Sequence, residues 1–388
     1  MLKVLYLVPN LADAAVARRI HMMRAGGAEV AIAGFRRADA APPDLDVVNY
    51  VELGETFDAR FGQRITAVVR ALGSIVRRLR PVGMPDVVIA RNLEMLPLAQ
   101  RLRASWPARP PLVYECLDIH RLLLREDVIG RAMRGTEQHL TRNAALLLTS
   151  SPAFLRNYFD IHGAPPAVVV ENKVFFEAGA PRGSNPALTS EPATDGPIRI
   201  GWFGALRCRK SLDALARFAN AMDGKVEIVL RGRPALTEFP DFHGFVATQP
   251  HMRFEGPYRN PQDLADIYST VHLAWAIDFF EEGLNSQWLL PNRIYEGCLH
   301  GAVPVALAGT ETAALVERHG IGIVLPNISE TTLFDRLGTL TTVRIGGLAR
   351  AVAAVDEGHF ACNAAECRMF VDRLQALTAP DQTLREAA

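Results

Sequence analysis

The chain has 388 residues, of which 49% are hydrophobic and 22% are charged, and its 42 lysines and arginines balance its 42 aspartates and glutamates. This composition excludes disordered, collagen-like and fibrous proteins, and the length predicts two or three globular domains. The five cysteines are scattered and show no CxxC spacing, which argues against a disulfide framework or a zinc site and favours a reducing compartment. No run approaches 18 apolar residues and no signal-cleavage pattern follows the start, so we expect a protein that does not span a membrane.

Strands and helices are predicted to alternate over the first half. Residues 3–8 have a buried-strand pattern, residues 12–24 a helical one that Gly26-Gly27 ends, and residues 29–34 form the next strand, which together make a βαβ unit. Further strands are expected over 86–90, 112–115, 145–149 and 167–170. The region is therefore predicted to be a doubly wound α/β domain, but the loop after its first strand lacks the GxGxxG of a dinucleotide-binding domain.

An amphipathic, basic helix is expected over 59–80. Its apolar side is predicted to contain Phe61, Ile65, Val68, Val69, Leu72, Ile75, Val76 and Leu79. Its basic residues are Arg64, Arg70, Arg77, Arg78 and Arg80. Packing against a sheet accounts for such a helix, and contact of its basic side with an anionic membrane surface is the alternative that remains open.

Ligands of doubly wound sheets bind beyond the carboxyl ends of the strands, so the loops 9–14, 91–94, 116–121 and 150–151 are the first to consider. Asp118 and His120 in the third of these loops are the candidates for acid or base catalysis. A histidine titrates near neutral pH, and an aspartate two residues away could orient it or accept a proton itself. Alternatively, the two side chains cap the helix that follows.

Residues 178–197 are rich in Pro, Gly, Ser, Thr and Ala and have no apolar periodicity, which predicts an interdomain linker. This divides the chain into a first domain over 1–177, a second over 198–356 and a helical tail over 357–388. The second domain opens with a strand, a small-residue loop from Gly204 and a cluster of Arg207, Arg209 and Lys210 before the next helix. A basic loop at a helix start is an anion site, although three basic residues on a solvated turn would look the same.

The segment from 285 to 307 reads as helix, glycine stop and strand. The helix is expected to start at Pro291 and to end at His300-Gly301, with Asn292, Arg293 and Glu296 in its first turn and a half. A helix start with an arginine binds anions, and a carboxylate one turn later can accept two hydrogen bonds from a ribose diol. The alternative is an ordinary capped helix with a solvated Arg–Glu pair.

Three strings carry a family resemblance. PNRIYEGCLHGAVPVA, residues 291–306, resembles the donor-site helix of GT-B glycosyltransferases of the family 4-like group, and PLVYECLDIH is similar to the segment in which an Asp or His faces the acceptor. Gly204, Leu206 and Lys210 are in register with that family's Gly-Arg-Leu…Lys-Gly loop. Two positions depart from the pattern: the usual arginine is Ala205, and the carboxylate expected eight residues before Glu296 is Trp288.

The resemblance implies two Rossmann-like doubly wound parallel-sheet domains facing a cleft, with the last helix crossing back to the first domain. It further implies a nucleoside-diphosphate-sugar donor and a hydroxyl acceptor, lipid-linked or saccharide, in exopolysaccharide or surface polysaccharide biosynthesis at the cytoplasmic face of the inner membrane. The residues expected to bind the donor diphosphate and nucleotide are Gly204, Arg209, Lys210, Arg231, Asn292, Arg293 and Glu296. Glu282 and Asn285, in the polar loop 278–287, are expected to contact the donor sugar.

No metal or cofactor is expected, because the DxD over Asp44–Asp46 lies in a Pro-rich stretch away from a suitable strand end and is interpreted as surface. Two alternatives keep the fold: a nucleotide-sugar epimerase and a non-catalytic binding or scaffold protein, the latter suggested by Trp288 and Ala205. Binding of nucleic acid is not expected, because the domain with the anion loops is net acidic.

Overall fold

The computed structural model describes residues 1–37, 45–56, 61–175 and 196–379. These residues form two compact units, one of Met1–Glu171 with Asn363–Ala388 and the other of Asn172–Cys362. Of the linker expected over 178–197, residues 178–195 lie outside the described parts, as does Asp44 of the DxD string. Asp46 is exposed and pairs with Arg24 at 3.2 Å.

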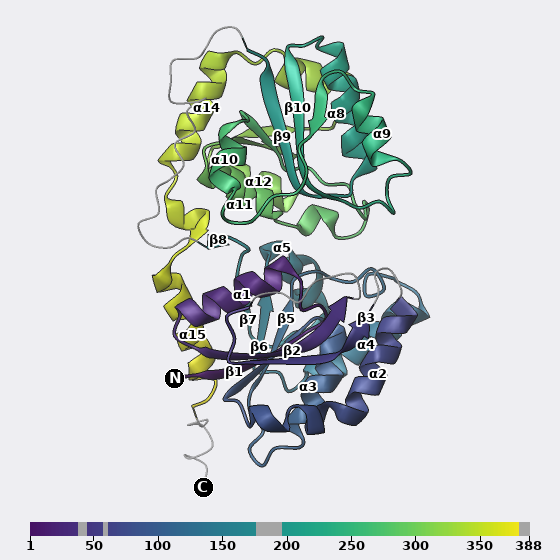
Figure 1. The fold of residues 1–388 in the computed structure, drawn as a ribbon, viewed down its shortest axis with the longest axis vertical. Coiled ribbons are helices and arrows are strands. Elements are labelled where there is room, and N and C mark those ends of the chain that lie inside the picture. The colour runs from purple at the N-terminus through teal and green to yellow at the C-terminus, as the bar shows by residue number, and fades with distance from the viewer. Residues whose placement is uncertain (38–44, 57–60, 176–195, 380–388) are drawn as a thin grey trace. The chain divides into compact units, whose positions relative to one another are not determined.

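The first unit contains a seven-stranded parallel sheet with the strand order β3-β2-β1-β4-β5-β6-β7 (Figure 1). Its strands are β1 (Lys3–Val8), β2 (Glu29–Arg37), β3 (Asn49–Thr56), β4 (Val87–Arg91), β5 (Leu112–Cys116), β6 (Leu146–Thr149) and β7 (Ala167–Val169). The inner strands are nearly continuous runs of buried Val, Ile and Leu, as expected where helices cover both faces. The order of the strands reverses between β1 and β4, which makes that position the topological switch point of the unit.

The helices of this unit are α1 (Ala14–Ala25), α2 (Phe61–Arg78), α3 (Leu96–Arg103), α4 (Val128–Thr141), α5 (Pro152–Phe154), α6 (Asp160–His162) and α15 (Ala364–Ala376). Shorter turns are η1 (Arg80–Val82), η2 (Leu93–Met95) and η3 (Leu155–Phe159). The C-terminal helix α15 packs beside α1, where Gly26 leaves room for the backbone carbonyl of Cys367 (Figure 1). The last helix of the chain therefore completes the core of the first unit.

The second unit contains a six-stranded parallel sheet with the order β11-β10-β9-β12-β13-β14. Its strands are β9 (Ile198–Leu206), β10 (Val226–Pro234), β11 (Met252–Phe254), β12 (Leu273–Trp275), β13 (Val303–Leu307) and β14 (Ile323–Leu325). A small separate sheet pairs β8 (Val174–Phe175) with β15 (Ala361–Cys362). The order reverses between β9 and β12, which is the switch point of this unit.

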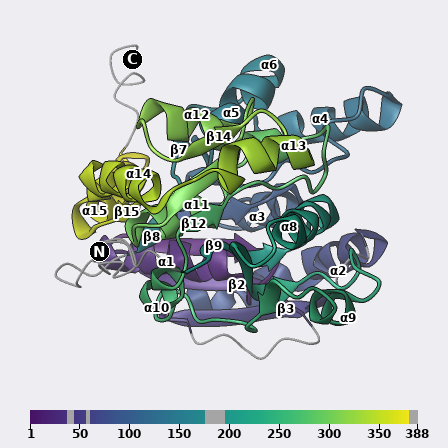
Figure 2. The same cartoon turned by 90° about the horizontal axis from the view of Figure 1, so that it is seen from above.

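Helices cover both faces of this sheet, with α8 and α9 on one and α10 and α11 on the other (Figure 2). The helices are α8 (Arg209–Ala221), α9 (Phe242–Ala247), α10 (Leu264–Ser269), α11 (Asn292–Leu299), α12 (Glu311–Arg318), α13 (Glu330–Leu333) and α14 (Thr342–Ala354). The remaining turns are η4 (Ser286–Trp288), η5 (Phe334–Gly338) and η6 (Glu357–His359). Both units thus have the doubly wound α/β architecture that the sequence predicts.

Two expectations need correction. Val69 and Val76, which were assigned to the apolar side of the basic helix, are exposed, Val69 by 60%. Strand β3 was not expected; it is an edge strand with Glu52, Gly54 and Glu55 and has no continuous apolar run.

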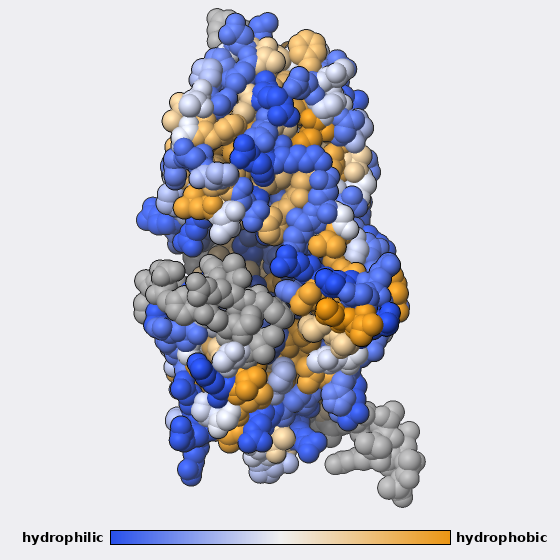
Figure 3. Space-filling model, turned by 90° about the vertical axis from the view of Figure 1, so that its right-hand side faces the viewer, coloured by the Kyte–Doolittle hydropathy of each residue, from blue (hydrophilic) through white to orange (hydrophobic). Residues whose placement is uncertain are grey.

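Figure 3 shows one face of the molecule, on which hydrophilic residues are interspersed with smaller groups of hydrophobic ones. In the described parts of the chain, no helix combines the length and the apolar character that crossing a bilayer requires.

Candidate functional site

The polar residues of the second unit gather at its switch point, beyond the carboxyl ends of β9 and β12. Strand β9 reaches this edge at Gly204, whose φ of +103° is a conformation that favours glycine. On the neighbouring strand β10, a Cβ at Gly232 would lie 1.9 Å from the carbonyl oxygen of Gly204. The two glycines therefore let the backbones of β9 and β10 approach closely at their carboxyl ends. Without side chains there, a ligand can reach the main-chain groups.

Helix α11 starts at this edge and places Arg293 there. Arg293 is only 6% exposed, and its Nη2 lies 3.2 Å from Oδ2 of Asp278, while its Nη1 lies 3.5 Å from the carbonyl oxygen of Phe203. Its Nε is buried and has no acceptor within the described residues. A guanidinium with an unmet donor thus lies at a helix start, where the backbone dipole also favours an anion.

Asp278, at the end of the β12 segment, was not among the predicted site residues. Its Oδ2 accepts hydrogen bonds from Arg293 and, at 3.3 Å, from Nε of Arg207, while its Oδ1 accepts one from the backbone N–H of Phe280 at 2.9 Å. The guanidinium of Arg207 also lies over the ring of Phe280, 4.5 Å from its centroid. One carboxylate therefore orients the two arginines of the site.

Glu296 lies one turn further along α11 and is 2% exposed. Its carboxylate accepts hydrogen bonds from the side-chain amide of Asn260 at 2.6 Å, from the hydroxyl of Tyr268 at 3.3 Å and from that of Tyr258 at 3.5 Å. Burial, and after it the charge of Glu296, raises the pKa of Tyr268 well above its usual range, so this hydroxyl stays protonated and donates. The alternative of a solvated Arg–Glu pair is wrong, because both side chains are buried and each has partners of its own.

Lys210 and Glu282 were assigned to the diphosphate and to the donor sugar respectively, and the structure brings them into direct contact. The ammonium of Lys210 lies 2.8 Å and 3.0 Å from the two carboxylate oxygens of Glu282. It also lies 4.2 Å from the ring centroid of Phe279. The thiol sulfur of Cys208 accepts hydrogen bonds from the backbone N–H groups of Phe279 and of Ser211, both at 3.3 Å, and so joins the loop after β12 to the start of α8.

Other predicted residues lie in different surroundings. Arg209 is exposed, pairs with Asp213 at 2.9 Å one turn along α8 and lies over the ring of Phe245. Arg231 pairs with Glu255 at 3.1 Å. Asn285 is buried in the loop before η4, and Asn292 is the partly buried first residue of α11. The structure therefore gathers Gly204, Lys210, Glu282, Arg293 and Glu296 and adds Arg207, Asp278 and Asn260. Arg209 is paired with Asp213, and Arg231 with Glu255.

The predicted acid–base pair lies in the loop after β5 of the first unit. Asp118 is exposed, and its carbonyl oxygen accepts a hydrogen bond from the Cys116 thiol. The Nδ1 atom of His120 accepts the backbone N–H of Leu122 at 3.3 Å, which stabilises a turn. Neither residue caps α4, whose N-cap is Asp127.

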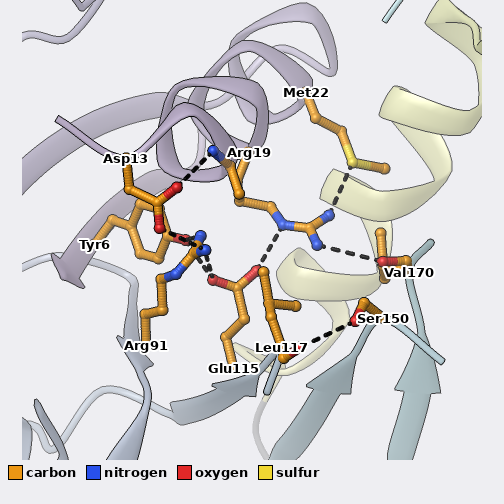
Figure 4. Close-up of polar contacts among 10 residues, drawn as sticks. Tyr6, Asp13, Arg19, Met22, Arg91, Glu115, Leu117, Ser150 and Val170 are labelled. Carbon is orange, nitrogen blue, oxygen red and sulfur yellow. Dashed lines mark hydrogen bonds and ion pairs between the residues drawn. The ribbon is translucent and has the colours of Figure 1, made fainter. Parts of the chain in front are cut away.

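A buried polar cluster that sequence reasoning missed lies beside this loop, at the carboxyl ends of β1, β4 and β5 (Figure 4). Its centre is Glu115, which is fully buried and accepts hydrogen bonds from Nε of Arg19 at 2.7 Å and from the hydroxyl of Tyr6. Arg91 lies 3.7 Å from the same carboxylate and pairs with Asp13 at 3.1 Å. In the sequence, Arg91 and Glu115 stand out as charged residues at the ends of otherwise apolar strands.

The charges of this cluster balance, with two arginines facing Glu115 and Asp13. Burial by itself would raise the pKa of the Glu115 carboxyl, but Arg19 and Arg91 outweigh burial and lower it. Burial, and next Glu115, raises the pKa of Tyr6 far above its usual range, so Tyr6 remains a donor. The cluster therefore orders the strand ends around the switch point and leaves the half-exposed Asp13 as its outermost charge.

The chain matches no protein-family model. It is 51% identical over 381 residues to the succinoglycan biosynthesis protein ExoL of Rhizobium meliloti (strain 1021), a match that covers 97% of the chain and 94% of that protein. Among solved structures, it resembles a sucrose-phosphate synthase of Thermosynechococcus elongatus, with 14% identity, full coverage of both chains and a TM-score of 0.69. It also resembles Anabaena Alr3699/HepE in complex with UDP and glucose, with 18% identity, 97% and 100% coverage and a TM-score of 0.66. At these identities the structural likeness shows the fold.

Proposed function

The chain belongs to the family of the succinoglycan biosynthesis protein ExoL and has the GT-B fold of glycosyltransferases, and from this premise we propose that it transfers a sugar from a nucleoside-diphosphate donor to a hydroxyl acceptor. The proposal places the reaction in exopolysaccharide biosynthesis, with a lipid-linked or saccharide acceptor. The observation that carries it is the pair of buried side chains on α11, because Arg293 and Glu296 offer an anion-binding donor and a diol-binding acceptor within the first turn and a half of the helix.

Glu296 is proposed to hold the ribose of the donor. The bonds from Asn260, Tyr268 and Tyr258 fix the plane of this carboxylate. A buried, oriented carboxylate binds a diol more strongly than a solvated one, because it has no water to lose and no rotamer freedom to give up.

Arg293, Arg207 and Lys210 are proposed to hold the diphosphate, together with the backbone at Gly204 and the start of α11. During transfer, negative charge develops on the departing diphosphate, and cations held in place beforehand stabilise that charge without reorganising. Arg207 replaces Arg209 among the residues proposed to bind the diphosphate, because the Arg209 side chain pairs with Asp213 and lies over Phe245 of α9. The buried Asp278 keeps both arginines oriented while no donor is bound.

Uracil is the first base to test, because Alr3699/HepE, which has a similar fold, has been solved with UDP and with UDP-glucose. The sugar is proposed to lie against the loop 278–287, with Glu282 and Asn285 as its contacts. The chain lacks the carboxylate expected at position 288, where Trp288 stands, so Glu282 is the proposed replacement.

The acceptor hydroxyl is proposed to be met by Asp118 or His120, which both lie in the loop after β5. Peripheral contact with an anionic membrane surface is proposed for α2, where Arg70 and Arg77 are exposed beside the exposed Val69 and Val76. The proposal includes no metal ion and no cofactor, since helix dipoles and basic side chains supply the positive charge.

Calorimetric titration with UDP, GDP, ADP and their sugar conjugates tests the donor site. We expect one nucleotide to bind selectively and an Arg293→Ala, Glu296→Ala double variant to lose that binding, while the control Arg209→Ala retains it. Conversion of the donor into an isomeric sugar without any second substrate would establish the epimerase instead. Selective binding with neither transfer nor isomerisation in a cell extract would support a scaffold protein, and a folded chain that binds no nucleotide would overturn the proposal.

A further inference from the structure

The loop after β12 lies directly on the basic loop after β9. Residues 278–282 contribute Asp278, which pairs with Arg207 and Arg293, and Glu282, which pairs with Lys210. The two phenylalanines between them stack under the same cations, Phe280 under Arg207 and Phe279 under Lys210. Each cation of the proposed diphosphate site therefore already has a carboxylate partner from one short segment.

The two carboxylates differ in how firmly they are held. Asp278 and Arg293 are both at least nine-tenths buried, so separating them would leave an unpaired buried charge, which is costly. Glu282 and Lys210 are each about half exposed, at 53% and 50%, and such pairs contribute little. An arriving diphosphate can therefore displace Glu282 from Lys210 at a small cost and leave Asp278 in place.

The backbone around Glu282 keeps it close to the site after such a displacement. The N–H of Phe279 is bound to Cys208, and the N–H of Phe280 is bound to Asp278, so the start of the segment is anchored on both sides. Glu282 itself stands between Glu281 and Gly283, which have φ angles of +58° and +85°, in a tight turn. Once released from Lys210, its carboxylate therefore remains in the loop after β12, beside the residues proposed to bind the diphosphate.

We propose that Glu282 exchanges partners, binding Lys210 in the donor-free protein and the hydroxyl groups of the donor sugar once the diphosphate has taken Lys210. This inference rests on the proposed function of the same site. A sugar conjugate returns to Glu282 the hydrogen bonds that it loses, whereas a bare nucleoside diphosphate leaves it without a partner. Glu282 is thus a specificity-determining residue that favours the donor over the nucleoside-diphosphate product, which aids release of the product.

The test compares the affinities of the wild type and Glu282→Gln for UDP, UDP-glucose and uridine by calorimetry. If the nucleotide titration selects another base, the corresponding three ligands of that base are used. Because exposed ion pairs contribute roughly 0.2–1 kcal/mol, we expect the variant to bind UDP about 1.4- to 5-fold more tightly. Affinity for UDP-glucose is expected to stay the same or fall, and affinity for uridine, which has no phosphate, is expected to stay the same.

Glu281→Gln is the matched control, because it removes the same charge from the neighbouring position, and within the described residues Glu281 makes no ion pair or side-chain hydrogen bond. It should leave all three affinities unchanged. In a double-mutant cycle, Lys210→Gln should weaken UDP binding and abolish the effect of Glu282→Gln.

The outcomes separate this inference from the function on which it rests. If the wild type binds UDP but Glu282→Gln binds it no more tightly, the exchange is wrong and the donor site stands. Equal tightening of UDP and UDP-glucose would show that Glu282 gains no partner on the sugar. A wild type that binds no nucleotide of any base would overturn the exchange together with the donor site.

Discussion

Asp278 and Arg293 form a 3.2 Å ion pair in which the two side chains are only 10% and 7% exposed. The pair joins the end of the β12 segment to the start of α11, so one buried contact links this strand to the helix that precedes β13. A second arginine, Arg207, shares the same carboxylate. The local charge in the absence of a ligand is therefore positive, which is the condition that a diphosphate needs.

Replacing Asp278 by Asn should destabilise the protein, because Arg293 would then be a buried cation without a counter-ion. We expect a loss of about 3 kcal/mol in the free energy of unfolding, measured by urea denaturation. The loss should shrink in the presence of UDP, since the diphosphate supplies the missing charge. Asp213→Asn, which breaks the exposed pair with Arg209, is the control and should cost less than about 1 kcal/mol. Equal losses in the two variants would contradict this account.

Removing Asn260, one of the hydrogen-bond partners of Glu296, should weaken the binding of the nucleoside and leave the phosphate contacts intact. Asn260→Ala deletes the 2.6 Å hydrogen bond to the carboxylate, and we expect affinity for uridine and for UDP to fall by the same factor, roughly ten-fold, as for a charge-assisted hydrogen bond. Calorimetry with both ligands measures this. Affinity for inorganic pyrophosphate should not change; if it falls as well, Asn260 acts on the whole site and not through the ribose.

Two buried glutamates in the described part of the first unit, Glu115 and Glu137, should affect the pH dependence of stability in opposite directions. Glu115 is paired with two arginines that lower its pKa, so its contribution to stability is complete above its usual pKa and is lost as the pH falls below that value. Glu115→Gln leaves Arg19 and Arg91 buried without this carboxylate, and we expect it to cost about 3–5 kcal/mol at pH 7. Urea denaturation measures the loss, and a cost below about 1 kcal/mol would show that the cluster contributes no net pairing energy.

Glu137 accepts hydrogen bonds from the hydroxyls of Tyr114 at 2.7 Å and Tyr158 at 2.5 Å, but the described residues give it no cation as an ion-pair partner. Burial raises its pKa, although the two hydroxyls oppose the shift. A raised pKa means that the folded state loses stability as the pH rises above the usual value for a glutamate. Glu137→Gln, which is neutral at every pH, should therefore make the protein less sensitive to this rise. The urea midpoint of the variant minus that of the wild type should be larger at pH 8 than at pH 5.

His300, which follows α11, should make the protein sensitive to mild acid. Burial lowers its pKa from 6.5 to about 4, so its neutral form is favoured in the folded state. The resulting stability is complete above pH 6.5 and is lost as the pH falls toward 4, by about 2 kcal/mol at pH 5. The variant His300→Gln should lose less stability than the wild type between pH 8 and pH 5. Urea midpoints at the two pH values measure this, and equal losses would show that His300 titrates normally.

The helices and strands that could be predicted are those that the pattern of their own residues determines, without contacts from distant parts of the chain. Apolar runs such as 3–8 and 303–307 are long enough to require burial on both faces, and the glycine stops after 24 and 300 end helices through local backbone geometry. The doubly wound sheets and helix α11 follow from these local patterns. The edge strand β3 was missed, because an edge strand needs no continuous apolar run.

The sequence by itself determined which chemistry the proposed donor site could contain, because Lys210, Arg293 and Glu296 occur in a local pattern at a loop and a helix start. Only the tertiary structure decided which side chains meet. Asn260 lies 36 residues from Glu296, and Asp278 lies 71 residues from Arg207, so neither contact has a local signal. The order of the strands brings them together. Parallel strands place their carboxyl ends at one edge, and the reversal between β9 and β12 assembles distant loops there.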